Sequence, residues 1–187
     1  TYDGNDGVME NNKVYLFDKD SSTPLWVYSN EGDARMFLSC DISSDGEYIV
    51  AGDFDREVHL FSKDSSTPLW IYEVSLAAYK VAISADGEYI VVGTDDDDVY
   101  LFDKDSSTPL WSYQIPYWGI YSVDISADGE YIVAGSTYST SKVYLFDKDS
   151  STPIWDYEAG NSVRSVSISA DGEYITAGSD DNKLYLF

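Results

Sequence analysis

One loop of the chain carries an aromatic cluster that no other part of the sequence repeats. Trp118 lies between Tyr117 and Tyr121, and Pro116 stiffens the approach to it. A tryptophan flanked by tyrosines offers flat apolar faces together with hydroxyl groups, which suit the anchoring of a ligand or partner. The residues leave a second interpretation open, in which Trp118 is a lid over the mouth of a channel.

Carboxylates are the second group of side chains able to do chemistry. Four of them stand together at Asp95, Asp96, Asp97 and Asp98. Oxygen ligands of this kind suit Ca²⁺, so the four residues are a candidate calcium site, and no other cofactor is predicted. Their spacing matches no twelve-residue calcium loop, however, and aspartates in such loops also cap turns.

The sequence shows no visible catalytic machinery. His59 is the only histidine, Cys40 is the only cysteine, and no glycine-rich phosphate loop occurs. Asp41 and Asp124 fall within predicted strands and are interpreted as tolerated polar positions, and Cys40 as a small apolar core residue. We therefore predict that the protein is not an enzyme.

The charge balance limits the partners. With 11 basic and 34 acidic residues, the formal net charge is −23, which argues against a nucleic-acid binder because such a protein needs a basic footprint. No run of about 18 apolar residues occurs, so we expect no direct insertion into a membrane.

A short strand that returns five times sets the architecture around these residues. Its copies begin at positions 14, 58, 99, 143 and 184, in steps of 44, 41, 44 and 41 residues. A tandem repeat of about 40–45 residues made of short strands is typical of β-propeller blades. The sequence thus predicts an all-β fold, a β-propeller of four-stranded antiparallel blades.

The third copy shows the four strands of one blade, named A to D from the innermost to the outermost. They are predicted at 121–125, 130–134, 143–146 and 154–157. We treat residues 1–187 as a single propeller segment with repeats at 14–57, 58–98, 99–142 and 143–183, and 184–187 starting a fifth. The repeats contain five C strands but four strands of each of the types A, B and D, so one C strand is left over when four blades close into a ring. We expect part of a larger ring, or a homo-oligomer joined through open propeller ends.

The two faces of the predicted disc differ in how much the copies vary. The A–B and C–D turns share one face and read nearly the same in every copy, as SADGEY and DKDSSTPLW, whereas the B–C and D–A loops on the other face differ. Because loops carry recognition while strands carry stability, we predict a binding surface on the variable face. The residues expected to contact the partner are Trp118, Tyr117, Tyr121, Tyr138, Phe54 and Arg56.

Four other tryptophans recur once per copy, at the D strand. Their periodic placement predicts a structural role, in which each packs against the neighbouring blade. They are Trp26, Trp70, Trp111 and Trp155.

Two stretches resemble known propeller repeats. Residues 126–135 (SADGEYIVAG) look like the WD40/YVTN-type repeat. Residues 99–111 (VYLFDKDSSTPLW) resemble the tryptophan-docking repeat of PQQ-like quinoprotein propellers, with Asp103 and Trp111 at that pattern's Asp and Trp and Ser107 at its Gly. The resemblance covers residues 14–187, although the Gly-His and Trp-Asp pairs of WD40 blades do not occur.

The resemblance implies an archaeal or bacterial propeller that is secreted or lies at the cell surface. Together with the residues, it predicts a non-enzymatic binding or scaffold module that recognises a protein or a glycan through its variable loops. Two alternatives remain: a structural repeat of a cell-surface layer, and a quinoprotein-like enzyme or electron-transfer component.

Overall fold

The chain folds into a curved row of small antiparallel sheets. The structure is a computed structural model that describes residues 12–30, 36–115, 119–137 and 140–187. Within these ranges it contains 17 β-strands and no helix. It therefore contains no helix that could span a membrane in the part of the chain that it describes. The all-β prediction is confirmed.

Each sheet follows the next in sequence order, so each is one propeller blade. Blade 1 has two strands, β1 (Lys13–Leu16) and β2 (Trp26–Ser29). Blade 2 has four: β3 (Phe37–Ile42), β4 (Tyr48–Asp53), β5 (Glu57–Ser62) and β6 (Trp70–Glu73). Blade 3 has β7 (Ala78–Ile83), β8 (Tyr89–Thr94), β9 (Asp98–Asp103) and β10 (Trp111–Gln114).

Blades 4 and 5 continue the pattern. Blade 4 has β11 (Ile120–Ile125), β12 (Tyr131–Ser136), β13 (Lys142–Asp147) and β14 (Trp155–Glu158). Blade 5 has β15 (Val163–Ile168), β16 (Ile175–Ser179) and β17 (Lys183–Leu186). Blade 1 therefore holds a C and a D strand and blade 5 an A, a B and a C strand, as the repeats predicted.

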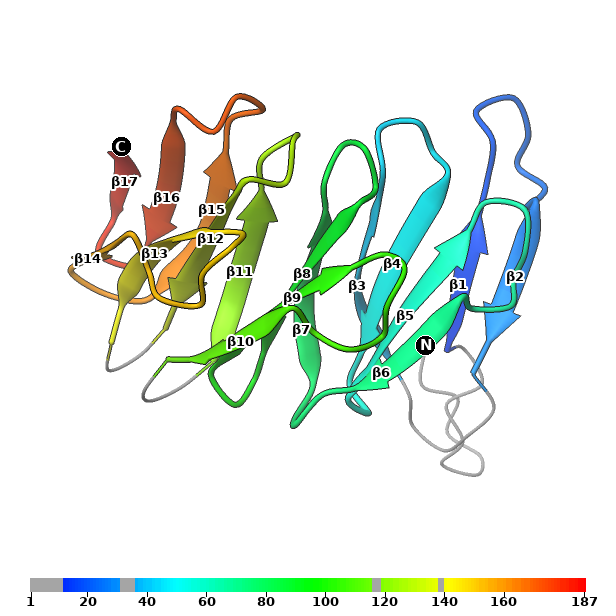
Figure 1. The fold of residues 1–187 in the computed structure, drawn as a ribbon, viewed down its shortest axis with the longest axis horizontal. Helices are drawn as coiled ribbons and strands as arrows, with labels where there is room; N and C mark the ends of the chain where they lie inside the picture. Colours follow the sequence, from blue (N-terminus) through cyan, green and yellow to red (C-terminus); the bar gives the residue numbers. More distant parts are fainter. Residues whose placement is uncertain (1–11, 31–35, 116–118, 138–139) are drawn as a thin grey trace.

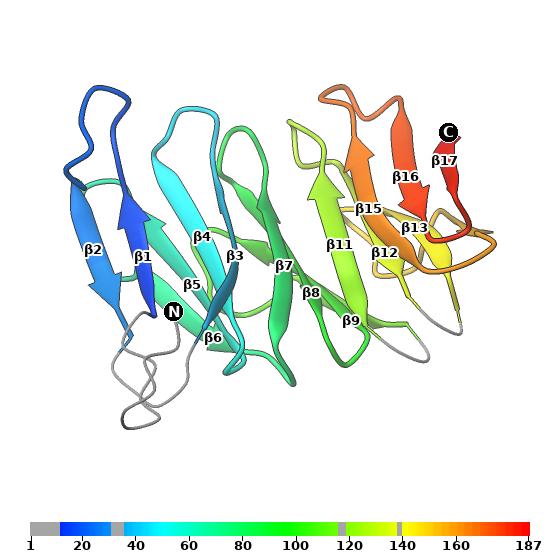
Figure 2. The same ribbon diagram turned by 180° about the vertical axis from the view of Figure 1, so that it is seen from behind.

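The blades stand side by side in an arc, and the ring is not closed (Figure 1). The four A strands, β3, β7, β11 and β15, lie next to one another along the inner side, which the view from behind shows (Figure 2). The A–B turns line the upper margin of Figure 1, and the links from one blade to the next lie below. We call this lower side, with its B–C and D–A loops, the loop face.

Burial explains why the middle strands of a blade read as continuous apolar runs. In β8 every residue after Tyr89 is buried, and in β9 the four residues between Asp98 and Asp103 are buried. Neighbouring blades cover both faces of these strands. The outer strand β10 is covered on one side only, so its side chains alternate between partly buried and exposed.

The outer strands hold the blades together through one contact that is repeated at every junction, or seam, between neighbouring blades. The indole of Trp111 packs on Phe146 of the next blade at a centroid distance of 5.4 Å, and its Nε1–H donates to the Lys148 carbonyl at 2.7 Å. Tyr113 meets the same Phe146 ring edge-on at 5.3 Å. Trp26, Trp70 and Trp155 pack on Phe61, Phe102 and Phe187 in the same way.

The A–B turns are tied to one another across the seams. The backbone N–H of Ser44 donates to the Ala85 carbonyl, that of Ala85 to Ala127, and that of Ala127 to Ala170, at 3.0–3.1 Å. A Cβ at Gly129 would overlap the Tyr89 ring of the preceding blade. The overlap with Tyr89 requires glycine at position 129, so packing accounts for part of the constancy of this face. The bonds between the turns join backbone atoms and do not depend on the side chains.

Side-chain clamps join the A strands at two of the three seams between them. Asp41 accepts the Ile83 N–H at 2.9 Å, and Ser39 accepts the Val81 N–H at 3.3 Å. At the seam between blades 4 and 5, Asp124 and Ser122 accept the equivalent N–H groups at 2.9 and 2.8 Å. Asp41 and Asp124 are thus acceptors that link blades, and their interpretation as merely tolerated polar residues was wrong.

Cys40 corrects a second expectation. Its thiol is exposed, whereas the equivalent Val81 and Val123 are buried. Val81 faces Gly52 on the B strand of the blade before it. Blade 1 has no B strand among the described residues to cover Cys40 in that way.

Candidate functional site

Every A strand breaks its register with a β-bulge near its start. The shifts lie between Phe37 and Ser39, between Ala78 and Lys80, and at the equivalent places of the two later blades. A bulge leaves one residue unpaired and re-aims its side chain, which is why bulges occur beside binding and active sites. The bulged residues, which we call the bulge row, are Leu38, Tyr79, Tyr121 and Arg164.

Three members of the bulge row, Tyr79, Tyr121 and Arg164, form a continuous surface across blades 3 to 5. The rings of Tyr79 and Tyr121 stack at a centroid distance of 4.9 Å and an interplanar angle of 26°. The Arg164 guanidinium lies 5.8 Å from the centre of the Tyr121 ring, within range of a cation–π interaction. Arg164 is also held by Asp180, whose Oδ2 lies 2.7 Å from the guanidinium.

These contacts bring two phenol rings and one guanidinium group together, and Leu38 adds an apolar side chain at the blade 2 end of the row. Both tyrosines are partly buried, and Arg164 is exposed. The four bulged positions hold three residue types, Leu, Tyr and Arg, although the strands around them repeat. The row can therefore offer aromatic edges, hydroxyl groups and a cation to a partner that approaches the inner strands from the loop face.

Comparison with known families agrees with the blade geometry. A family profile described as outer membrane protein assembly factor BamB matches residues 55–187, which is more than half of the chain. The chain belongs to this family of PQQ-like β-propeller repeats. A second profile, described as WD domain, G-beta repeat, matches residues 23–62, so both expected resemblances are confirmed. A search of curated proteins found no match.

The propeller places the predicted contact residues on different blades. Tyr121 belongs to the bulge row on the inner strand of blade 4. Phe54 and Arg56 lie in the B–C loop of blade 2, two blades away. Three further predicted residues, Trp118, Tyr117 and Tyr138, lie outside the described residues.

The B–C loop of blade 2 holds its two predicted residues differently. Phe54 is 48% exposed. Arg56 adopts a φ of 75°, and its guanidinium lies 2.8 Å from Glu73 Oε1. Its carbonyl accepts the N–H of Val74 at 2.8 Å. Arg56 therefore ties its own loop to the link that leads into blade 3, although its side chain is as exposed as that of Phe54.

The four consecutive aspartates are engaged mainly in local hydrogen bonds. Asp96 accepts the Thr94 hydroxyl at 2.6 Å, and Asp97 accepts the Gly119 N–H. Asp98 accepts the hydroxyl groups of Ser75 and Tyr100 at 3.1 and 3.2 Å. Burial, reinforced by the neighbouring carboxylates, raises the pKa of Asp95 and of Asp98.

A different cluster brings three metal-ligating side chains together. Ligand atoms of Asp53, Glu57 and His59 lie within 4.8 Å of one another, the only such group of three in the part of the chain that the structure describes. His59 Nε2 lies 3.2 Å from Asp53 Oδ2 and 3.6 Å from Glu57 Oε2, and the His59 ring is fully buried.

The second ring nitrogen of His59, Nδ1, distinguishes a metal site from a hydrogen-bonded pair of His59 and Asp53. His59 Nδ1 is buried and has no hydrogen-bond partner among the described residues. A metal on Nε2 would leave the proton on Nδ1, where an acceptor is normally supplied. The arrangement fits a His59 ring that donates its Nε2–H to Asp53, and no metal is assigned to it.

Sequence reasoning found one member of the bulge row, Tyr121, and missed Tyr79 and Arg164. Both lie at the start of the A strand, where a period of two predicts ordinary pairing. The available signal was that this position holds Leu, Tyr, Tyr and Arg in the four copies, while the residue four places further on is Ile in all of them.

Proposed function

We propose that this propeller is a non-enzymatic binding module that recognises a protein partner through its loop face. The observation that carries the proposal is the bulge row, in which Tyr79, Tyr121 and Arg164 form one surface from three blades. Aromatic and arginine side chains supply most of the energy in protein interfaces. WD-type repeat domains, to which part of the chain is similar, commonly mediate protein interactions.

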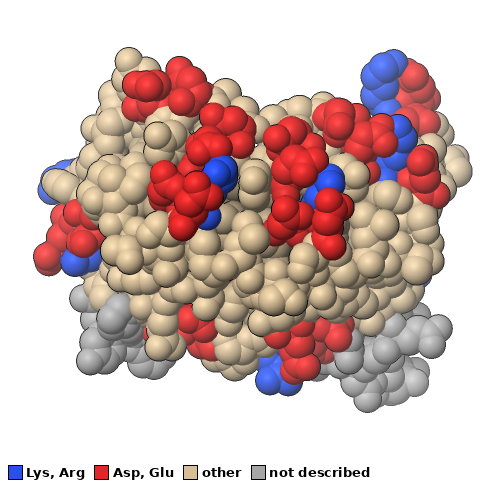
Figure 3. Space-filling view, viewed as in Figure 1, with Lys and Arg blue, Asp and Glu red and all other residues tan. Residues whose placement is uncertain are grey.

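The charge of the chain indicates what kind of partner it would take. On the face shown in Figure 3, carboxylates gather in groups over the upper half and at the lower margin with few basic side chains among them, and the net charge of the chain is −23. A partner with a basic contact surface would be attracted at low salt, and its association rate would fall as salt rises. We therefore expect a basic protein segment on the loop face.

Display of a random peptide library tests this function, with a glycan array as the second arm. We expect the wild-type chain to enrich basic peptides and the Tyr79→Ala, Tyr121→Ala double variant to lose them. Tyr174 is 62% exposed on the A–B turn side, so Tyr174→Ala is the matched control and should still bind. Retention of every peptide by the double variant would refute the assignment, and enrichment of glycans alone would replace the protein partner with a carbohydrate.

A further inference from the structure

The seam between blades 3 and 4 lacks the clamp that closes the seams on either side of it. At the two flanking seams, a Ser and an Asp of one A strand accept two N–H groups of the next. In β7 these two positions hold Lys80 and Ala82. Lysine has no acceptor atom and alanine has no polar side chain, so neither can replace the missing acceptors.

The donors on the other side of this seam are still present. Val123 occupies the place of Val81 and Val166, whose N–H groups bond to serine hydroxyls. Among the described residues, no side chain accepts the Val123 N–H. The Lys80 ammonium makes neither a hydrogen bond nor an ion pair with any of them. Ile125 N–H turns back to its own Asp124 Oδ1 at 3.0 Å. The seam thus presents an ammonium and a backbone N–H without an acceptor.

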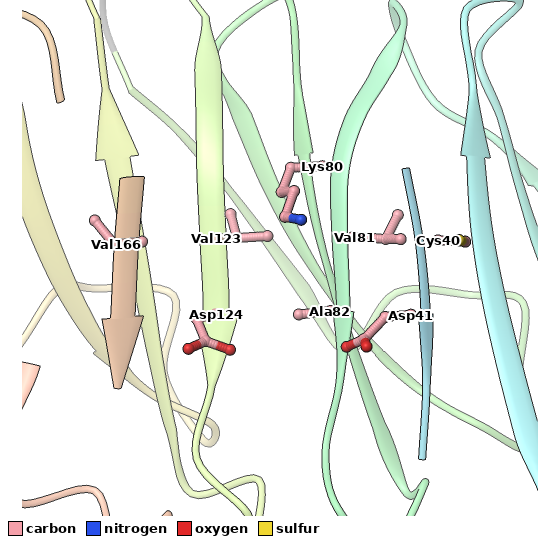
Figure 4. A pocket seen from close by; sticks show the side chains of 8 residues that line it. All are labelled: Cys40, Asp41, Lys80, Val81, Ala82, Val123, Asp124 and Val166. Carbon is pink, nitrogen blue, oxygen red and sulfur yellow. The ribbon is translucent and has the colours of Figure 1, made fainter. Parts of the chain in front are cut away.

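A cavity lies at this seam. Its volume is about 250 Å³, and its lining extends along the four A strands, with Lys80, Val81 and Ala82 of β7 and Val123 and Asp124 of β11 at the centre and Cys40, Asp41 and Val166 at the ends. Figure 4 shows the Lys80 side chain reaching into the space between β7 and β11, with Ala82 below it and Asp124 and Asp41 to either side. Ala82 lacks the carboxylate that Asp41 and Asp124 carry at the equivalent positions of the neighbouring A strands.

We propose that this cavity binds a small zwitterion that carries one carboxylate and one ammonium group, the chemistry of an amino acid. The carboxylate takes the place of the absent Ser and Asp acceptors and bonds to the Lys80 ammonium and the Val123 N–H. A purely anionic ligand would bring a further negative charge next to Asp41 and Asp124 in a chain of net charge −23. An ammonium group on the ligand offsets that repulsion by facing Asp124.

The two halves of the ligand predict different responses to simple probes. In a ¹⁵N-labelled sample, L-alanine and 4-aminobutyrate should shift the Val123 amide resonance in a saturable way at about 1–10 mM, the range expected for so few atoms. Acetate, which has only the carboxylate, should bind at least tenfold more weakly. Methylammonium should leave the Val123 amide unchanged.

The sequences at the flanking seams show which substitutions would close the site. Lys80→Ser with Ala82→Asp copies the clamp of the flanking seams, so it should abolish the shift and slow hydrogen exchange at Val123. Slowed exchange also shows that this variant is folded. Lys13→Ser is the matched control, because Lys13 is an exposed lysine outside the cavity, and it should bind as the wild type does.

Three results would overturn the proposal. The first is the absence of a saturable Val123 shift with either zwitterion, and the second is an undiminished shift in the Lys80→Ser, Ala82→Asp variant. The third is acetate binding as tightly as L-alanine, which would remove the ammonium half and leave a plain carboxylate site. The test involves neither peptides nor the bulge-row variants, so its outcome is separate from that of the loop-face assignment.

Discussion

Removal of the Asp124 carboxylate should weaken the seam between blades 4 and 5 by an amount that can be derived from its contacts. Asp124 Oδ2 accepts the Ile168 N–H and the Ser167 hydroxyl, both at 2.9 Å, across the seam. Among the residues that the structure describes, Asp41 makes only one such bond, to Ile83 N–H at 2.9 Å, because Ala82 has no hydroxyl group. The two aspartates therefore differ by one hydrogen bond between blades.

Taking each of these partly exposed bonds at about 1 kcal/mol, Asp124→Ala should lower the free energy of unfolding by about 2 kcal/mol and Asp41→Ala by about 1 kcal/mol. Each variant also removes one negative charge from a strongly acidic chain. The resulting relief of charge repulsion stabilises both variants by a similar amount, so it leaves the difference between their free energies of unfolding unchanged.

Urea titration followed by tryptophan fluorescence measures these free energies, in about 0.15 M salt to limit the charge contribution. Because stacked repeats can open one unit at a time, amide exchange should be recorded as well. Exchange at Ile168 should accelerate in Asp124→Ala and not in Asp41→Ala, and the reverse should hold at Ile83. A loss that is larger for Asp41→Ala, or exchange that changes equally at both amides, would refute the clamp.

Two further predictions concern the turns and loops. Gly46 and Gly129 have nearly equal φ values of 74° and 73°, but only a Cβ at Gly129 would meet a side chain, Tyr89. Gly46→Ala should therefore cost about 1–2 kcal/mol of backbone strain, and Gly129→Ala clearly more in the same urea titration; equal costs would contradict the packing. The Tyr185 hydroxyl is the main cause that lowers the pKa of Asp181 to about 2. The hydrogen bonds that lower this pKa stabilise the folded protein fully above pH 3.8, the ordinary pKa of the carboxyl group. This stabilisation is lost as the pH falls from 3.8 to about 2. In Tyr185→Phe the pKa should rise toward 3.8 in a carbon-detected NMR titration, and an unchanged pKa would assign the shift to the other donors.

The sequence was sufficient to predict the blades because each copy repeats the same local signals. The D strand expected at 154–157 is found at Trp155–Glu158, and the C strand expected at 143–146 at Lys142–Asp147. Short apolar and aromatic runs on either side of the Asp-Lys-Asp-Ser-Ser-Thr-Pro turn at 147–153 determine these elements locally. A docking role for the recurring tryptophans was also readable from their period, and the structure shows Trp111 on Phe146.

The site depended on relations between blades, which a linear pattern does not contain. A bulge shifts the register by one residue without changing the alternation of residue types, so the row of Tyr79 and Arg164 was not visible. The acceptor role of Asp124 depends on an N–H group 44 positions later in the chain. Likewise, the lack of an acceptor at Lys80 becomes apparent only when β11 lies beside it.

The repeated seam has a consequence for how such a chain can change in length. Because Trp111 meets Phe146 in the way that Trp70 meets Phe102, the outer-strand surface that one blade offers to its successor is nearly the same throughout. Duplication or deletion of one blade's worth of coding sequence would therefore join surfaces that already fit. Blade number is then free to vary among relatives, and an additional blade could be inserted by design without redesigning its neighbours.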